Sequence, residues 1–341
     1  MKKRLSIADI AEALNISKTS VSFILNGQAE EKRISKKLVD KVVQYVEEVG
    51  YKPNLLAKSL RTGKSNTIAL MVEDISNPFF ASIARLIEDR AYQNGYRITY
   101  CSTDNDTAKT KDMIGIFQDR HVDGYIIAPP EGIEDDILSL QKNNLPVVLF
   151  DRYLQHADTD YVITDNKAGT HQATNMLAKN GYKKIAFITF ANPQVQMRDR
   201  LQGYLDAIKQ NNLEHFVAEV LFSRNDQDIT KPILDFLNQH KQLDAVVFGT
   251  NHVGACGLKA IQQLGLKVPD DLAVISFDDY DVFQLHSPPV TAIAQPIQQI
   301  ANQVINLLLN KLNGATDILQ TQQIVIPGQL HIRSSSAAKI S

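Results

Sequence analysis

The sequence predicts an α/β protein in which a small basic head of three helices precedes a body of two lobes, each built on a doubly wound parallel sheet. Two observations support this prediction. Residues 1–64 hold 13 basic and 7 acidic side chains, a net charge of +6, which leaves −8 on the remainder. After residue 66, short β-branched runs alternate with helical stretches at the spacing of βαβ units. With 341 residues, the chain is long enough for two or three domains.

Composition excludes several classes of protein. No run approaches the roughly 18 uninterrupted apolar residues of a membrane helix. Asp9 and Glu12 interrupt the apolar segment that a secretory signal would need after the basic start. Cys101 and Cys256 lie far apart and in no metal-ligand spacing, which favours buried thiols in a reducing compartment. We therefore expect a cytoplasmic protein with no membrane partner, no metal and no cofactor.

The head begins with two helices joined by a sharp turn. Ser6, which an acidic residue follows three positions later, is typical of the N-cap of a helix over residues 7–13. Asn15 tolerates the left-handed conformation that a sharp turn requires. Ser17 is well placed to cap a second helix, which ends near Leu25. The expected order is helix, short turn, helix.

A third helix follows the break at Asn26-Gly27. Ser35 caps it and Gly50 ends it, and an apolar stripe lines one side. Three amphipathic helices can close a small core, so a generic bundle with a solvated basic surface is the alternative to a nucleic-acid reader. The start of the second helix favours the reader, because its outer face carries mostly short polar side chains that suit close approach to bases and phosphates.

These segments resemble a known family. The run SIADIAEALNISKTSVSFILNG, the RIS at 33–35 and GYKPNLLAKSLRTGKS at 50–65 are similar to the DNA-binding head and hinge of the lactose-repressor (LacI/GalR) family of bacterial transcription regulators. The resemblance implies a helix-turn-helix whose second helix reads the major groove. The residues it implies as DNA contacts are Ser17, Lys18, Thr19, Ser20, Ser22, Phe23, Asn26, Tyr51, Asn54, Ala57 and Leu60.

The resemblance also separates these contacts by role. Asn26, Tyr51 and Asn54 would hold the phosphate backbone. Ala57 and Leu60 match hinge-helix positions that enter the minor groove and kink the duplex. Phe23 stands where family members often carry arginine, so a guanidinium contact to guanine is not implied. Phe23 contacts a thymine methyl or packs into the core of the head.

The body contains the β-branched runs in two series, as two similar lobes require. The resemblance implies a body like the periplasmic sugar-binding proteins, in which the chain crosses between the lobes three times. The predicted domains are the helix-turn-helix domain 1–52, the hinge helix and linker 53–66, and the effector-binding and dimerisation domain 67–341. The expected strands are 67–73, 96–101, 123–128, 146–150, 184–190, 217–222, 244–248, 272–277, 291–296 and 322–327, with a helix at 296–312.

Polar and aromatic side chains gather after the predicted strands. Ligands of open α/β sheets bind beyond the carboxyl ends of the strands, so a cleft between the lobes is the expected site. By resemblance, Arg200, Asn251 and Asp278 correspond to effector contacts. Internal salt bridges, or plain core packing for the phenylalanines, are the alternatives. The predicted effector contacts are Phe79, Phe80, Arg152, Asp165, Arg198, Arg200, Asn251 and Asp278.

No enzyme motif is found: there is no GxSxG, phosphate-loop, HExxH or GxGxxG pattern. We expect a repressor that binds a pseudo-palindromic operator as a homodimer. Its small-molecule effector is a carbohydrate or sugar phosphate, with an acidic sugar or a nucleobase as alternatives. A sugar sensor or transport-type binding protein without DNA binding would share the body but not the head. The tail HIRSSSAAKIS lacks a leucine heptad, so a tail-mediated tetramer is not expected.

Overall fold

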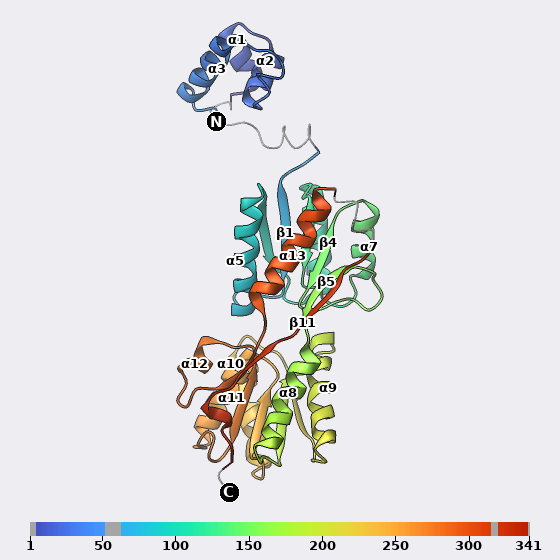
Figure 1. Cartoon of the computed structure of the whole chain (residues 1–341), viewed down its shortest axis with the longest axis vertical. Helices are drawn as coiled ribbons and strands as arrows, with labels where there is room; N and C mark the ends of the chain where they lie inside the picture. The colour runs from blue at the N-terminus through green and yellow to red at the C-terminus, as the bar shows by residue number, and fades with distance from the viewer. Residues whose placement is uncertain (1–4, 52–62, 315–319, 340–341) are drawn as a thin grey trace. The chain divides into compact units, whose positions relative to one another are not determined.

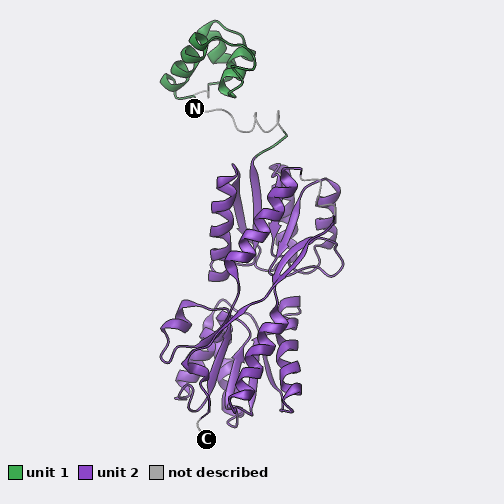
Figure 2. Ribbon diagram, viewed as in Figure 1, with its two compact units in different colours: residues 1–65 green, residues 66–341 purple. Residues whose placement is uncertain are grey.

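The computed structural model describes residues 5–51, 63–314 and 320–339. The chain divides into two compact units, residues 1–65 and 66–341 (Figure 2). Three predicted DNA contacts, Asn54, Ala57 and Leu60, lie outside the described residues. The predicted separation of a hinge over 53–66 therefore stays a prediction.

The head contains α1 (Ile7–Leu14), α2 (Lys18–Leu25) and α3 (Lys36–Glu48), as predicted. The N-cap Ser6 and Asp9 form a reciprocal capping box, and Asn15 has a φ of 53° at the turn. Ser35 occupies the N-cap of α3, but its side chain makes no capping hydrogen bond. Apolar side chains of all three helices meet in one small core that includes Ile10, Val21 and Val42.

The first lobe of the body is built on one parallel sheet. Its elements are β1 (Thr67–Val72), α5 (Pro78–Gln93), β2 (Arg97–Ser102), α6 (Thr107–Asp119), β3 (Gly124–Ile127), α7 (Glu134–Lys142), β4 (Val147–Phe150), β5 (Asp160–Thr164), α13 (Ile297–Leu312) and β11 (Gln323–Ile326). The strand order is β11-β5-β4-β3-β1-β2, with every pairing parallel. Helices α5 and α13 pack on one face, and α6 and α7 pack on the other.

The second lobe repeats this arrangement. Its elements are α8 (Asn166–Lys179), β6 (Ile185–Phe190), α9 (Val195–Gln210), β7 (Phe216–Val220), α10 (Asp226–Gln239), β8 (Ala245–Phe248), α11 (Asn251–Gln263), β9 (Ala273–Phe277), α12 (Asp281–Leu285), β10 (Thr291–Ala294), β12 (Gln329–His331) and η1 (Ser334–Ser336). The strand order is β12-β10-β9-β8-β6-β7. Only the short edge strand β12, which the sequence did not predict, is antiparallel among the pairings of the described strands. Both sheets are doubly wound, as predicted.

The chain crosses between the lobes three times: from β5 to α8, from β10 to α13, and from β11 to β12 (Figure 1). The crossing segments contact one another. The Thr164 hydroxyl donates to Gln295 Oε1 (2.6 Å), and the Asp165 backbone N–H donates to the carbonyl of Ile326 (2.9 Å). Any rotation of one lobe against the other must therefore bend segments that are hydrogen-bonded together.

The RLQGY motif at 200–204 has a packing reason. A Cβ added at Gly203 would lie 2.2 Å from the carbonyl oxygen of Lys167 on α8, so α9 can approach α8 this closely only with glycine there. The next residue, Tyr204, is buried, and its hydroxyl donates to the carbonyl of Ile185 (2.8 Å). The motif thus fixes α9 against the second sheet, and this positions Arg200, the first residue of the motif.

The structure corrects the predicted burial of one of the two thiols. Cys256 is buried as predicted, but Cys101 is only half-buried, because it lies on the edge strand β2.

The tail packs on the second lobe: the Ser335 hydroxyl donates to the carbonyl of Val274 (2.6 Å), and the Lys339 backbone N–H donates to the carbonyl of Asn180 (2.9 Å). Among the described residues, no helix is long and apolar enough to cross a membrane.

Candidate effector site and DNA-reading surface

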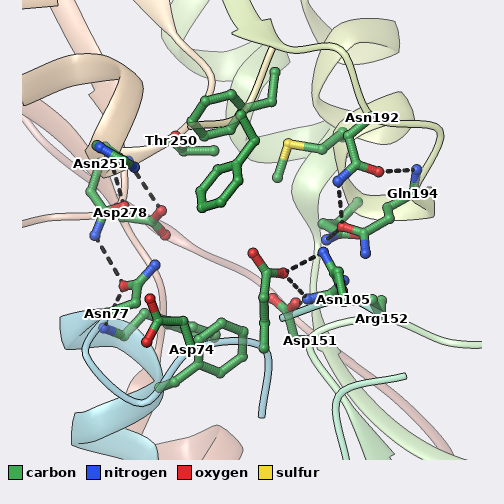
Figure 3. Close-up of a pocket in the computed structure, with 18 of the residues that line it drawn as sticks. Asp74, Asn77, Asn105, Asp151, Arg152, Asn192, Gln194, Thr250, Asn251 and Asp278 are labelled. Carbon is green, nitrogen blue, oxygen red and sulfur yellow. Dashed lines mark hydrogen bonds and ion pairs between the residues drawn. The ribbon is translucent and has the colours of Figure 1, made fainter. Parts of the chain in front are cut away.

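A cleft between the two lobes of the body holds a cavity of about 230 Å³. It lies beyond the carboxyl ends of the parallel strands, as predicted. Figure 3 shows amide and carboxylate side chains of both lobes around this space. The ionisable side chains that line it are the carboxylates Glu73, Asp74, Asp104, Asp151 and Asp278, the guanidiniums Arg152, Arg200 and Arg224, and the imidazole His252.

Arg152, which follows β4, is held by a network within the first lobe. Its three nitrogens donate to Glu73 Oε2 (2.6 Å), Asn105 Oδ1 (2.7 Å) and Asp151 Oδ2 (3.0 Å). Burial lowers the pKa of the Arg152 guanidinium, but the carboxylates of Asp151 and Glu73 outweigh that effect and raise the pKa overall. Arg152 is therefore a fixed positive charge that the protein itself neutralises.

Arg200, on α9, is held by contacts within the second lobe. Its Nε donates to Asn166 Oδ1 (2.8 Å), its Nη1 donates to the carbonyl of Gly249 (2.8 Å), and its guanidinium lies 3.6 Å from the centroid of the Phe277 ring. Burial lowers the pKa of Arg200, and the Asp278 carboxylate, 4.0 Å from Nη1, opposes the change. Arg200 thus forms part of the cavity wall.

Asp278 connects the cavity to the segments that cross between the lobes. Its Oδ1 accepts a hydrogen bond from Gln295 Nε2 (2.6 Å), and Gln295 in turn accepts one from Thr164. Its Oδ2 accepts the backbone N–H of Asn251 (3.4 Å). A ligand that contacts this carboxylate is therefore linked to two of the three crossing segments, those that contain Gln295 and Thr164.

Asp278 and Asp151 occupy equivalent places in the two lobes. They follow β9 and β4, which hold the same position in the two strand orders. Their φ angles are 65° and 67°, in the left-handed region. Residues other than glycine adopt this conformation uncommonly, and such residues concentrate at functional sites. The backbone thus turns both carboxylates toward one cavity.

Two polar contacts join the lobes across the cleft. Asn251 Nδ2 of the second lobe donates to Asn77 Oδ1 of the first lobe (3.3 Å), a contact visible in Figure 3. The Arg224 Nη2 of the second lobe lies 2.5 Å from Asp104 Oδ1 of the first. The Arg224 side chain is 74% exposed, so this ion pair lies at the rim of the cleft. Both contacts require the lobes to be close together.

Replacing Arg224 with alanine is expected to weaken ligand binding in the cleft by at most about fivefold, because an exposed ion pair contributes about 0–1 kcal/mol. The loss should appear as faster ligand dissociation in stopped-flow fluorescence, since the pair forms only when the lobes approach. Exchange of the exposed Lys231 on α10 for alanine is the matched control and should leave the rate unchanged. A dissociation rate unaffected by the Arg224 change would show that the pair does not hold the lobes together.

Aromatic and amide side chains complete the wall. Phe79 and Phe80 belong to the core of the first lobe and also line the cavity, so core packing does not exclude them from the cavity wall. Phe190 and Phe222 line the cavity from the second lobe. At the start of α9, the Gln196 amide nitrogen donates to Gln194 Oε1 (2.9 Å), whereas the buried Gln196 Oε1 has no hydrogen-bond partner.

The structure brings six of the eight predicted effector contacts to the cavity: Phe79, Phe80, Arg152, Arg200, Asn251 and Asp278. It does not bring the other two there. Asp165 is the N-cap of α8, where its side chain accepts the backbone N–H of Ala168 (2.9 Å). Arg198 is exposed and lines a separate depression beside Tyr153 and His156. On a helix, the side chains of residues 198 and 200 point in different directions, so neighbouring arginines need not share a site.

Several residues of the cavity were missed in the sequence. Glu73, Asn105 and Asp151 follow β1, β2 and β4, so the strand-end rule that selected Arg152 applies to them equally. Gln194 and Gln196 follow β6 by a loop, and Gln295 lies in a crossing segment. No local pattern could indicate Gln295, because its place in the cavity depends on how the two lobes are connected.

The head presents a polar face on α2. Lys18, Thr19 and Asn26 are exposed, and Phe23 is half-buried with the Lys32 ammonium 5.5 Å from its ring centroid. Phe23 is absent from the apolar core of the head, which argues against the core alternative. Tyr51 does pack on that core, and burial raises the pKa of its hydroxyl.

The polar residues at the start of α2 stabilise the helix itself. The Ser17 hydroxyl accepts the backbone N–H of Ser20 (3.0 Å) and lies 2.9 Å from the Ser20 hydroxyl. The Asn26 amide donates to the carbonyl of Ser22 (2.6 Å) at the other end. The predicted DNA contacts of Ser17, Ser20 and Asn26 would therefore form in addition to these capping hydrogen bonds or replace them.

Comparison with known proteins decides the family. Residues 6–54 match the model of bacterial regulatory proteins of the lacI family, and residues 174–336 match that of periplasmic binding protein-like domains. The chain is 29% identical over 332 residues to the ribose operon repressor of Halalkalibacterium halodurans, covering 97% of both chains. The chain belongs to the LacI family. As a LacI-family protein it is a DNA-binding transcriptional regulator, which confirms the reading of the basic head.

Other LacI-family relatives cover 80–90% of the chain. The transcriptional repressor PurR of Aliivibrio salmonicida is 28% identical over 309 residues, 90% of this chain and 92% of its own. A solved LacI-family regulator of Enterococcus faecium with bound ribose is 25% identical, with a TM-score of 0.71 over 80% of this chain and 99% of its own.

Two further solved structures define the fold. A periplasmic binding protein/LacI transcriptional regulator of Alkaliphilus metalliredigens in complex with D-xylulofuranose is 27% identical, with a TM-score of 0.71 over 81% of this chain and all of its own. The lac repressor dimer bound to operator and the anti-inducer ONPF is 22% identical and shares the fold, with a TM-score of 0.86 over 98% of this chain and all of its own.

Proposed function

We propose that this LacI-family regulator is a repressor whose effector is a small, uncharged sugar bound in the cleft between the lobes. The proposal rests on the pairing of the cavity's arginines with carboxylates. Each of the three arginines of the cavity lies within 4.0 Å of a carboxylate, and the wall holds five carboxylates in all. The site therefore has an excess of negative charge, which disfavours a sugar phosphate or an acidic sugar.

Cavity size and lining agree with a monosaccharide. The volume of about 230 Å³ is below the roughly 300–1,000 Å³ of pockets for drug-sized ligands. Carboxylates such as Asp278 and Asp151 can accept hydrogen bonds from adjacent hydroxyl groups, and phenylalanine rings can stack on the apolar face of a sugar. The free Gln196 Oε1 is a further acceptor for a hydroxyl donor. The ribose and xylulofuranose complexes of relatives support a pentose in particular.

A nucleobase is the second candidate, because a PurR is among the relatives and the cavity has aromatic walls. The two candidates differ in what they demand of the wall. A polyol offers many hydroxyl donors to an acidic site, whereas a purine needs a balanced set of donors and acceptors. The excess of carboxylates favours the polyol.

The identifying experiment is a thermal-shift screen of the purified full-length protein with neutral pentoses and hexoses, sugar phosphates, uronic acids and nucleobases. A neutral sugar is expected to raise the unfolding temperature, because a ligand at 100 times its Kd contributes about 2.7 kcal/mol. Isothermal titration should give one site per chain. Stabilisation by sugar phosphates but not by the parent sugars would contradict the charge argument.

We infer that the regulator acts as a homodimer on a pseudo-palindromic operator, and not as an enzyme. One recognition helix reads a half-site, so two-fold symmetry of the protein matches that of the DNA. The body carries exposed apolar side chains suited to dimer contacts: Tyr92, Tyr100, Leu221 and Leu285, which are 55–85% exposed. The effector would close the lobes and thereby shift the first lobes of the two protomers against each other.

A substitution of Lys18 tests the DNA-binding role of the head. Its replacement by alanine is expected to weaken binding to all DNA sequences and to reduce the slope of log affinity against log salt by roughly 2 per dimer, because each lost phosphate contact removes about one released counterion. Fluorescence anisotropy over a salt series measures both quantities. Lys36, exposed on α3 and not a predicted contact, is the matched control. An unchanged slope would remove Lys18 from the interface.

A further inference from the structure

One cluster of side chains combines three metal-ligand chemistries. Asp226 begins α10, and His252 and Cys256 lie four residues apart on α11, on the same face of that helix. Their carboxylate, imidazole and thiol ligand atoms all lie within 4.8 Å of one another. In the part of the chain that the structure describes, this is the only group of three or more such residues at this spacing.

The spacing is close to that of a tetrahedral site. His252 Nε2 lies 3.1 Å from Asp226 Oδ1. Two ligands at about 2.0–2.1 Å from a zinc ion are roughly 3.3 Å apart in tetrahedral geometry, and a thiolate would lie roughly 3.6 Å from either. The Cys256 sulfur lies at most 4.8 Å from the other two ligand atoms, so it must move toward them by about 1.2 Å at most. Asp226 and His252, whose side chains are 47% and 30% exposed, have room to make that adjustment.

Asp226 already has a cationic partner, but that partner uses its other oxygen. The Lys259 ammonium lies 2.6 Å from Oδ2, whereas the imidazole faces Oδ1. A metal on Oδ1 can therefore leave the lysine in place to orient the carboxylate. The rings of Phe190 and Phe222, with centroids 5.9 and 6.1 Å from that of His252, supply an apolar surrounding.

We propose that Asp226, His252 and Cys256 bind a divalent transition metal of the zinc class, with water in the fourth position. Mixed sulfur, nitrogen and oxygen ligands suit zinc and exclude magnesium and calcium, which take oxygen alone. As the Sγ–metal bond forms, the thiol releases its proton to solvent, and carboxylate and thiolate together balance the charge of the ion. His252 also lines the effector cavity, so the metal would lie at the wall of that cavity whichever effector binds there.

The test is a titration of the full-length protein, free of any histidine tag, with cobalt(II) and then with zinc(II). One cobalt per chain is expected, with visible d–d bands of a tetrahedral ion and a thiolate-to-cobalt charge-transfer band that zinc abolishes. Cys256→Ser should remove the charge-transfer band, and His252→Gln should lower the cobalt affinity by roughly tenfold or more. A proton released to a weakly buffered solution with each cobalt provides a second readout.

Cys101→Ser is the matched control, because it removes the other thiol, on β2 of the first lobe, and should leave every band in place. Circular dichroism and thermal unfolding establish that each variant is folded. The proposal is overturned if folded wild-type protein shows no charge-transfer band, or if the Cys256→Ser and His252→Gln variants bind cobalt as tightly as the wild type. Either result would leave Asp226 as an ordinary helix-end ion pair.

Discussion

Replacing Asp278 with alanine is expected to lower the affinity for the sugar effector by about 100-fold and to abolish its effect on operator binding. A hydrogen bond to a charged group contributes about 1.5–3 kcal/mol, so loss of two such bonds to a polyol corresponds to at least that factor. The change also frees Gln295 and the backbone N–H of Asn251, and it removes the carboxylate nearest Arg200. Titration calorimetry and operator anisotropy with and without the sugar measure the two effects.

The stability of the variant must be separated from its binding. Removing the partner of a buried charge is itself destabilising, so Asp278→Asn, which keeps the size and one acceptor oxygen, is the second variant. Asp281→Ala is the matched control, since Asp281 is exposed on the neighbouring α12 and does not line the cavity. Operator affinity should be unchanged in all three. An undiminished sugar response in both Asp278 variants would remove this residue from the effector site.

Replacing Leu60 with alanine is expected to weaken operator binding by about 10- to 100-fold without a matching loss of stability. The prediction rests on the family resemblance, because Leu60 lies outside the described residues. An apolar wedge unstacks a base step and kinks the DNA, and the bend allows further contacts. A helix of about seven residues is too short to be stable alone, so we expect the segment to form its helix only on DNA and its partner.

Leu55→Ala is the matched control in the same segment, since Leu55 is not among the DNA contacts that the family resemblance implies. Anisotropy on the operator and on the same operator already bent at its central step would distinguish a wedge from a general contact. The loss should be smaller on DNA that is already bent. Equal operator affinity for wild type and Leu60→Ala would rule out the hinge assignment.

Much of the fold could be predicted because its signals are local. A capping serine and a left-handed asparagine define the first two helices, and β-branched runs define the strands of both sheets. The edge strand β12 was missed, since a three-residue segment carries too little pattern. Cys101 was misplaced for a related reason: a run of strand residues does not reveal whether its strand lies at the centre or at the edge of a sheet.

The sequence by itself determined that a basic head precedes an acidic body, and it predicted Arg200 and Asp278 for the cleft of that body. Only the tertiary structure decided which neighbours share that site. It brought Glu73 and Asn105 to Arg152 and left Arg198 outside. It also joined Asp226 on α10 to the thiol of α11. The physical reason is that caps, strands and charge are properties of neighbouring residues, whereas a cavity is formed by side chains that only the packing of the lobes brings together.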